Sequence, residues 1–204
     1  MYNSFRYIFF AAFLVLFNFS KAQTARDYLL KGNEKDKAGD HAGAILLYNK
    51  SIELDSSHSI TFINRAIAKA TSGDYAGAIL DYDKVLSINP NKADAYLNRG
   101  NAKIHLKDYT GAILDFNKAI SIDPGNSLYY YNRALAEIYM SKHAAAIQDY
   151  TMSIQLDPKN ALVYYYRGSA KYEAGDQNGG CEDWKRARDL KYGPATEMIR
   201  KFCK

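Results

Sequence analysis

Arginine and aspartate recur in this chain at a fixed distance from each other, and they are the side chains best suited to charge chemistry. Four Arg–Asp pairs are each separated by 16 residues: Arg65 with Asp81, Arg99 with Asp115, Arg133 with Asp149, and Arg167 with Asp183. Each pair predicts an ion bridge between two structural elements, worth roughly 0 to 1 kcal/mol if it is partly exposed. In the alternative interpretation, these charges bind a ligand.

The histidines, by contrast, offer no metal-binding or nucleophilic pattern. No two of them are four residues apart, and the sequence contains no HExxH motif, no Ser-His-Asp spacing and no Cys-x-x-Cys motif. The four are His41, His58, His105 and His143. The glycines are scattered and form no phosphate-binding loop. We therefore expect no metal site, no cofactor and no catalytic centre.

A small residue followed four positions later by an aromatic one recurs every 34 residues. The pairs are Ala44–Tyr48, Ala78–Tyr82, Ala112–Phe116 and Ala146–Tyr150. A fixed period of this length indicates one supersecondary unit copied along the chain, in which each copy buries its apolar face against its neighbours. We expect one elongated domain that binds rather than catalyses.

One such unit, residues 93–126, has large, small and proline residues at six characteristic positions: Tyr96, Gly100, Ala112, Phe116, Ala119 and Pro124. It resembles the tetratricopeptide repeat, in which two amphipathic helices cross closely because only Gly or Ala stands at the crossing. The same register gives five units, at residues 25–58, 59–92, 93–126, 127–160 and 161–194. The resemblance implies an all-α fold, a right-handed α-solenoid of helix-turn-helix repeats.

The fifth unit departs from the pattern in a way that is typical of a terminal repeat. Gly180 stands for alanine, Trp184 for tyrosine and Tyr192 for proline. An apolar stripe at helical spacing follows, formed by Ala195, Met198, Ile199 and Phe202. We expect residues 195–204 to form a capping helix that covers the end of the array.

In this family the first helices of successive units line a concave groove, and the resemblance assigns the residues that face into it. Asparagines recur there: Asn33, Asn64, Asn98, Asn101 and Asn132. An amide side chain can pair with both the C=O and the N–H of an extended peptide, so these residues predict a peptide-binding line. The alternative is that they are common family residues without a binding role.

The same face changes character along the array. The second and third units present Ile63, Ile67 and Leu97, whereas the last two present Tyr131, Tyr165, Tyr166 and Tyr172. Tyrosine is enriched at binding hot spots, so we expect the tyrosine-rich end to be the main contact surface. In the runs 129–131 and 164–166, Tyr130 and Tyr164 are assigned to the core and the others are expected to be exposed. Packing between helices and stacking on sugar rings are the alternatives.

The first 22 residues differ from the rest of the chain. Arg6 precedes an apolar stretch over residues 8–19, and Ser20 and Ala22 place small residues before a cut at Gln23. This pattern predicts a cleaved signal peptide at residues 1–22 and an exported protein, periplasmic or secreted. The apolar stretch of about 12 residues is shorter than the roughly 20 that span a bilayer, so we expect no membrane span after cleavage. An uncleaved anchor is the alternative.

The charge of the chain does not favour nucleic acid as a partner. The formal net charge is +5, and cleavage would remove Arg6 and Lys21 but no acid. No run of five or six like charges occurs in the mature chain. We expect a protein or peptide ligand instead.

Two cysteines, Cys181 and Cys203, are an even number in a chain that is expected to be exported. We predict a disulfide that fastens the cap to the last repeat and stabilises the fold by roughly 3 kcal/mol. Two buried free thiols and a redox pair are the alternatives.

Together these patterns predict a non-enzymatic scaffold or adaptor that binds a peptide or a partner helix in its groove. Two other hypotheses stay open. One is a structural subunit of a cell-envelope assembly, which makes its contacts through another surface. The other is a glycan-binding module.

Overall fold

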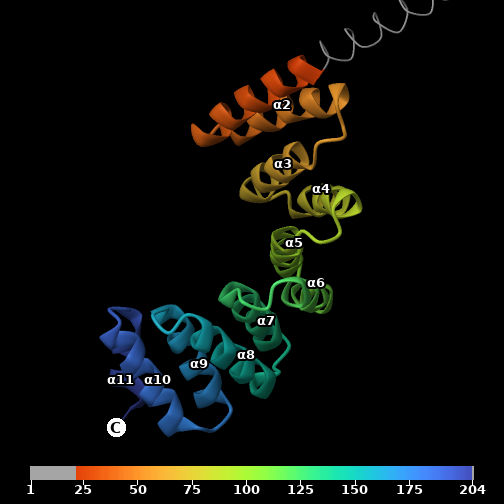
Figure 1. The fold of residues 1–204 in the computed structure, drawn as a ribbon. Coiled ribbons are helices and arrows are strands. Elements are labelled where there is room, and N and C mark those ends of the chain that lie inside the picture. The colour runs from red at the N-terminus through yellow and green to blue at the C-terminus, as the bar shows by residue number, and fades with distance from the viewer. Residues whose placement is uncertain (1–21, 204) are drawn as a thin grey trace, which may run out of the picture. The chain divides into compact units, whose positions relative to one another are not determined.

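The computed structural model describes residues 22–203 and is entirely helical and turn-like over that range. The predicted signal peptide, apart from Ala22, lies outside the described residues. The first helix covers residues 22–37, and it is followed by α2 (His41–Leu54), α3 (Ser59–Thr71), α4 (Tyr75–Ile88), α5 (Ala93–His105), α6 (Tyr109–Ile122), α7 (Ser127–Tyr139), α8 (His143–Leu156), α9 (Ala161–Glu173), α10 (Gln177–Asp189) and α11 (Pro194–Phe202) (Figure 1). Among the described helices, none combines the length and the apolar character needed to cross a membrane.

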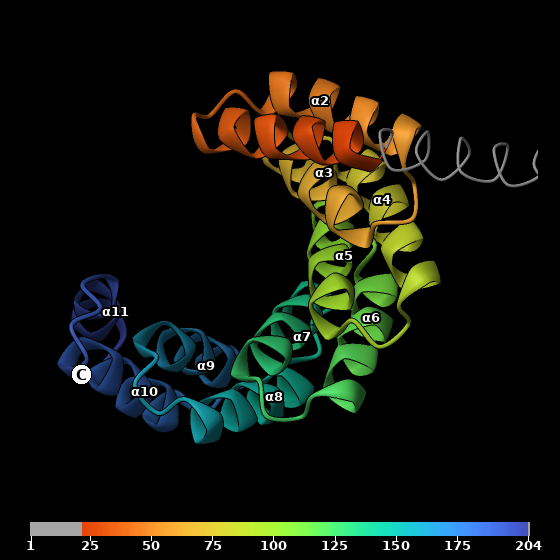
Figure 2. The same cartoon turned by 45° about the horizontal axis from the view of Figure 1, so that its top comes forward.

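These helices form two compact units, which we call unit one (up to Pro90) and unit two (from Asn91). In unit one, α3 packs against both α2 and α4. In unit two, each helix from α5 to α11 packs against the next, and Figure 2 shows the pairs α7/α8 and α9/α10 side by side. Consecutive helices therefore pair as in a tetratricopeptide solenoid, which confirms the predicted fold class.

Small residues at the helix crossings allow the helices to pack closely in the core. The four alanines of the 34-residue period are completely buried, and so are their aromatic partners to within 2%. A Cβ added at Gly100 would lie only 2.6 Å from the Phe116 ring. In the last repeat, a Cβ at Gly180 would lie 2.8 Å from the carbonyl oxygen of Gly168. Glycine replaces alanine at position 180 because the two backbones already touch there.

An aspartate caps the second helix of four repeats. Each accepts a hydrogen bond from the backbone N–H of a glycine three residues later: Asp40 from Gly43, Asp74 from Gly77, Asp108 from Gly111, and Asp176 from Gly179. A Cβ on these glycines would lie within 2.4 Å of the capping carboxylate as it is placed, so the aspartate side chain would have to shift if a larger residue stood there. In the fourth repeat both change together, to Lys142 and Ala145, and α8 has no side-chain cap.

Replacement of a capping aspartate should have a moderate effect on stability. We expect Asp108→Ala to lower the free energy of unfolding of unit two by about 1 kcal/mol, because the first N–H groups of α6 lose an acceptor. Urea titration followed by circular dichroism measures this loss. The matched control is Lys142→Ala, which removes no cap and should stay within about 0.5 kcal/mol of the wild type. Equal losses in both variants would contradict the proposed role of the cap.

The four predicted Arg–Asp ion pairs are confirmed. In each, both Nε and a terminal nitrogen of the arginine donate to the two carboxylate oxygens, and each aspartate is at most 6% exposed. The guanidinium carbon also lies 5.4–5.7 Å from the centroid of the aromatic ring three residues earlier. These arginines are thus engaged in joining the two helices of their own repeat.

A lysine completes this network in three of the four repeats. Lys69, Lys103 and Lys171 each contact the aspartate of their own repeat. In the fourth repeat the equivalent residue is Glu137, whose Oε2 is buried and has no hydrogen-bond partner among the described residues. Burial, reinforced by the charge of Asp149, raises the pKa of Glu137 to about 7. This repeat therefore contains a carboxyl group where the others contain an ammonium group.

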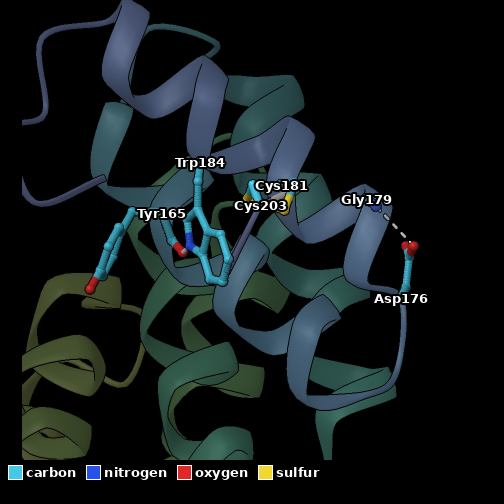
Figure 3. Close-up of a disulfide and its surroundings, with 6 residues drawn as sticks. All are labelled: Tyr165, Asp176, Gly179, Cys181, Trp184 and Cys203. Atoms are coloured by element: carbon cyan, nitrogen blue, oxygen red, sulfur yellow. Dashed lines mark hydrogen bonds between the residues drawn. A yellow bond between two sulfur atoms is a disulfide. The ribbon is translucent and has the colours of Figure 1, made fainter. Parts of the chain in front are cut away.

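The C-terminal helix α11 closes unit two. Pro194 begins the helix, Ala195 is fully buried, and Phe202 packs against both Trp184 and Tyr172. The indole N–H of Trp184 donates to the backbone carbonyl of Tyr165. A disulfide joins Cys181 of α10 to Cys203, with a Cα–Cα distance of 5.7 Å, and Figure 3 shows it beside Trp184. The cap is thus held by apolar packing and by a covalent bond.

Candidate ligand-binding faces

The first helix and α3 of unit one present apolar side chains that the core does not use. Leu30, Ile60 and Ile67 are 41–50% exposed, and Ile63 is half-buried beside them in sequence. On α3 the three isoleucines stand at helical spacings of three and four residues, so they share one side of the helix. We call these four residues, together with Asn33 and Asn64, the unit-one face.

Asn33 is the hydrogen-bonding centre of this face. Its Oδ1 accepts from the hydroxyl of Tyr48 at 3.0 Å and from Nδ2 of Asn64 at 2.8 Å. Each amide is thereby held in one orientation, which keeps the Asn33 amino group and the Asn64 carbonyl oxygen for other partners. A donor and an acceptor held side by side match the alternating groups of a peptide backbone.

Loss of the Asn33 side chain should destabilise unit one. We expect Asn33→Ala to lower its free energy of unfolding by about 1 kcal/mol, because the buried hydroxyl of Tyr48 would lose its acceptor. The double variant Asn33→Ala/Tyr48→Phe removes both partners and should recover part of that loss. Chemical denaturation of the two variants measures the difference. A further loss in the double variant would show that the bond is unimportant.

The asparagines of unit two are held differently. Asn98 and Asn101 on α5 are half-buried and make no side-chain hydrogen bond within residues 22–203. Asn132 donates from Nδ2 to the carbonyl of Leu128 in its own helix. Leu97 packs against the buried cluster around Phe116. The predicted peptide-binding asparagines are therefore better preorganised in unit one than in unit two, because Asn33 and Asn64 hydrogen-bond to each other.

Tyrosines gather around α7 and α9 of unit two. Centroid distances between neighbouring rings are 6.0 Å for Tyr131–Tyr166, 5.5 Å for Tyr165–Tyr166 and 5.1 Å for Tyr165–Tyr192. Tyr150, which is completely buried, lies 6.0 Å from Tyr131 and 6.3 Å from Tyr166. We call these five residues the tyrosine cluster.

Three hydroxyl groups of this cluster, those of Tyr131, Tyr150 and Tyr165, have raised pKa values. Burial, with smaller contributions from neighbouring tyrosines, raises the pKa of Tyr131 to about 12. Burial also raises the pKa values of Tyr150 and Tyr165. These three hydroxyl groups therefore stay protonated at physiological pH and can donate hydrogen bonds.

Two tyrosines have surroundings other than those expected for the contact surface. Tyr172 packs between Trp184 and Phe202, at centroid distances of 5.4 and 5.0 Å, so it also helps to hold the cap. The expectation that Tyr129 is exposed was wrong: it is 2% exposed, and its hydroxyl donates to Asp94 of the preceding repeat. The third position of this repeat faces the neighbouring first helix, which is why the side chain is buried.

Four contributors to these faces were absent from the sequence-based set. One is Leu30, which occupies in the first repeat the position that Asn64 holds in the second. Tyr150 was assigned to helix packing alone, Tyr192 was treated only as a departure from the repeat pattern, and Ile60 was not considered. The spacing of three residues between Ile60 and Ile63 is the signal that would have identified Ile60. For Tyr192, no sequence signal indicated that it meets Tyr165.

Comparisons with known proteins agree with this architecture. Models of the tetratricopeptide repeat match residues 25–58, 93–126 and 128–160, and a model described as TPR repeat matches residues 68–105. None of the curated proteins matches the chain.

Several solved structures share the fold. A crystal structure of MamA is 25% identical, with a TM-score of 0.75, and the match covers 81% of this chain and 96% of that one. MamA from Desulfovibrio magneticus RS-1 is 21% identical, with a TM-score of 0.78 and coverage of 82% and 95%. YrrB, described as a TPR protein with an unusual peptide-binding site, is 16% identical, with a TM-score of 0.72 and coverage of 85% and 90%.

Proposed function

Because the chain belongs to the tetratricopeptide repeat family, we propose that it is a non-enzymatic scaffold that binds an extended peptide or a partner helix along its first helices. The observation that carries this proposal is the unit-one face. There, exposed isoleucines flank two asparagines whose amides are fixed by a shared hydrogen bond. Apolar area supplies affinity, and oriented amides supply backbone recognition.

The tyrosine cluster is the second surface that supports this function. Rigid aromatic side chains with hydroxyl groups give contact area at a low cost in conformational entropy. Two or three buried aromatics with a few hydrogen bonds of about 1 kcal/mol each correspond to an affinity around micromolar. We propose the predicted residues of both units as the contact set, with Tyr150 and Tyr192 added.

Substitutions on the two faces test the proposal against a matched surface. Ile67→Glu changes the unit-one face, and Tyr165→Ala changes the tyrosine cluster. The controls are Leu80→Glu and Leu114→Glu on the second helices. Affinity purification from cells that produce the protein should lose the same partner with both face variants and keep it with both controls. Retention of that partner by the face variants, with their helical circular dichroism intact, would contradict the proposal.

A second function, that of a structural subunit of an envelope assembly, is favoured by one specific observation. Leu46, Leu80 and Leu114 occupy the same position of the first three repeats, and each is 64–69% exposed. An exposed leucine repeated on successive second helices supplies apolar contacts for assembly. In the purification above, loss of the partner only in the Leu80→Glu or Leu114→Glu variant would support this function. The glycan-binding module remains a third proposal, tested below.

We also propose that the protein acts after export from the cytoplasm. The pattern of residues 1–22 is typical of a signal peptide, and a structural disulfide fits an oxidising compartment. N-terminal sequencing of the protein purified from its natural cells should begin at Gln23. A sequence that begins at Met1 would contradict cleavage.

A further inference from the structure

The hydroxyl group of Tyr150 is a buried donor without an acceptor. The residue is completely buried, and its oxygen has no hydrogen-bond partner in the described part of the chain. Its equivalent in the first repeat, Tyr48, donates to Asn33. In the fourth repeat the residue that corresponds to Asn33 is Leu135, which has no acceptor. A buried hydroxyl without a partner destabilises the free protein, so the presence of one here suggests that a ligand supplies the acceptor.

The charged group that acts on Tyr150 is an acid. The Glu137 carboxyl contributes, after burial and the neighbouring tyrosines, to the raised pKa of Tyr150. Tyr131 and Tyr166 lie over it, and both are half-buried. The residues that share their helix faces at spacings of three and four are uncharged: Leu128, Ala134 and Leu135 on α7, and Leu162, Val163, Ser169 and Ala170 on α9. The Ser169 hydroxyl is already bonded to the carbonyl of Tyr165. The site therefore offers tyrosine hydroxyls and apolar area, with one acid nearby and no cation among these residues.

This chemistry selects a neutral hydrogen-bond acceptor. A carboxylate would have to lose its water without meeting a cation, which is costly. A sugar ring prefers one flat aromatic platform, but the outer rings are inclined to each other by 55° for Tyr131–Tyr166 and 78° for Tyr165–Tyr166. Rings that are inclined to each other leave narrow gaps between them. Such gaps suit a ligand with a compact apolar ring next to a carbonyl group.

We propose that the tyrosine cluster binds a proline-rich segment of a partner protein, with a backbone carbonyl of that segment accepting a hydrogen bond from Tyr150. In the polyproline II conformation the backbone makes no internal hydrogen bonds, so its carbonyls are free to accept. Proline has no backbone N–H that would need an acceptor, and aromatic-lined surfaces are suited to its ring. Because Tyr150 is completely buried in the free protein, this binding requires a change of side-chain rotamer at Tyr131 and Tyr166. This inference rests on the proposed scaffold function.

Fluorescence anisotropy of labelled decaproline with the purified chain tests this directly. The wild type should bind it saturably, and Tyr150→Phe should weaken binding about fivefold to tenfold, the loss of one hydrogen bond. The same variant should melt within about 2 °C of the wild type or above it, because no bond of the free protein is lost. Tyr131→Ala, which removes one of the inclined rings, should weaken binding further. Tyr75→Phe in unit one is the matched control and should bind normally.

Three outcomes would overturn the inference. They are the absence of decaproline binding up to about 1 mM, equal affinity of the wild type and Tyr150→Phe, and saturable binding of a β-linked glucose hexamer but not of decaproline. The last result would favour the glycan-binding function. If decaproline fails to bind while Ile67→Glu and Tyr165→Ala still lose the natural partner, the scaffold function stands and only its proposed ligand class is wrong.

Discussion

Removal of the Cys181–Cys203 disulfide is expected to lower the free energy of unfolding of unit two by about 3 kcal/mol. The bond closes a segment of 22 residues, and it joins α10 to the end of the capping helix. Without it, α11 is held only by the packing of residues such as Phe202 against Trp184. Urea titration of the Cys181→Ser/Cys203→Ser variant measures the loss.

Trp184 provides a local readout for the same experiment because it is the only tryptophan of the chain and is completely buried beneath the cap. Opening of the cap exposes the indole, so its fluorescence should shift to longer wavelength at a lower urea concentration than in the wild type. The control is Leu114→Ser, which alters an exposed residue of α6 in the same unit and should leave the transition in place. Identical transitions for the cysteine variant and the wild type would show that the disulfide does not hold the cap.

Replacement of Glu137 by lysine is expected to stabilise unit two by about 2 kcal/mol at pH 8. Lysine occupies this position in three other repeats that contain the Arg–Asp pair, and there it contacts the aspartate. Glu137 instead places a second carboxyl group near Asp149 and leaves a buried oxygen without a partner. The substitution would remove a buried unpaired acceptor and add a charge-assisted contact.

The stability of the wild type should also fall as pH rises from about 4.5 to about 7. The pKa of Glu137 is about 7 in the folded protein, against an ordinary value of 4.5. Folding therefore takes up a proton in this interval, and the stabilisation is lost as pH rises through the folded pKa. A shift of this size corresponds to at most about 3 kcal/mol, and screening by solvent reduces it to about 1–2 kcal/mol. Above pH 7 this contribution is constant.

The free energies of unfolding of the wild type and Glu137→Lys should be measured at several pH values. Groups that titrate in both proteins cancel in the difference between the two free energies, so the difference reports the titration of Glu137. The gain from lysine should be small near pH 5 and reach its full value near pH 8. Glu137→Gln keeps the shape of the side chain and should remove the pH dependence with a smaller gain. A difference that does not change with pH would show that Glu137 is ionised throughout.

Much of the fold could be predicted from the sequence because equivalent residues recur at each position of the repeat. The period of 34 and the alanine–aromatic pairs predicted two crossing helices per unit, and the buried residues Ala112 and Phe116 lie as expected. The co-occurrence of Arg133 with Asp149 predicted an ion pair in the same way. These features depend on local spacing, which a sequence displays directly.

The properties of the candidate faces depend instead on contacts between repeats. Tyr129 is buried because its hydroxyl reaches Asp94, 35 residues earlier. The orientation of Asn33 depends on Asn64, 31 residues later. Glu137 lies at a position outside the family pattern, so that pattern does not distinguish it. The signal in the sequence is that Lys69, Lys103 and Lys171 stand at the same position of the other repeats with an Arg–Asp pair.

We expect partners to contact the unit-one face and the tyrosine cluster. Site-specific photo-crosslinking in intact cells tests this expectation most directly, with a photoreactive amino acid placed at Ile67 or Tyr165 on the faces, or at Leu80 or Leu114 on the second helices. We predict that the two face positions give adducts with the same partner and that the two leucine positions give none. Adducts formed only from Leu80 and Leu114 would contradict the account.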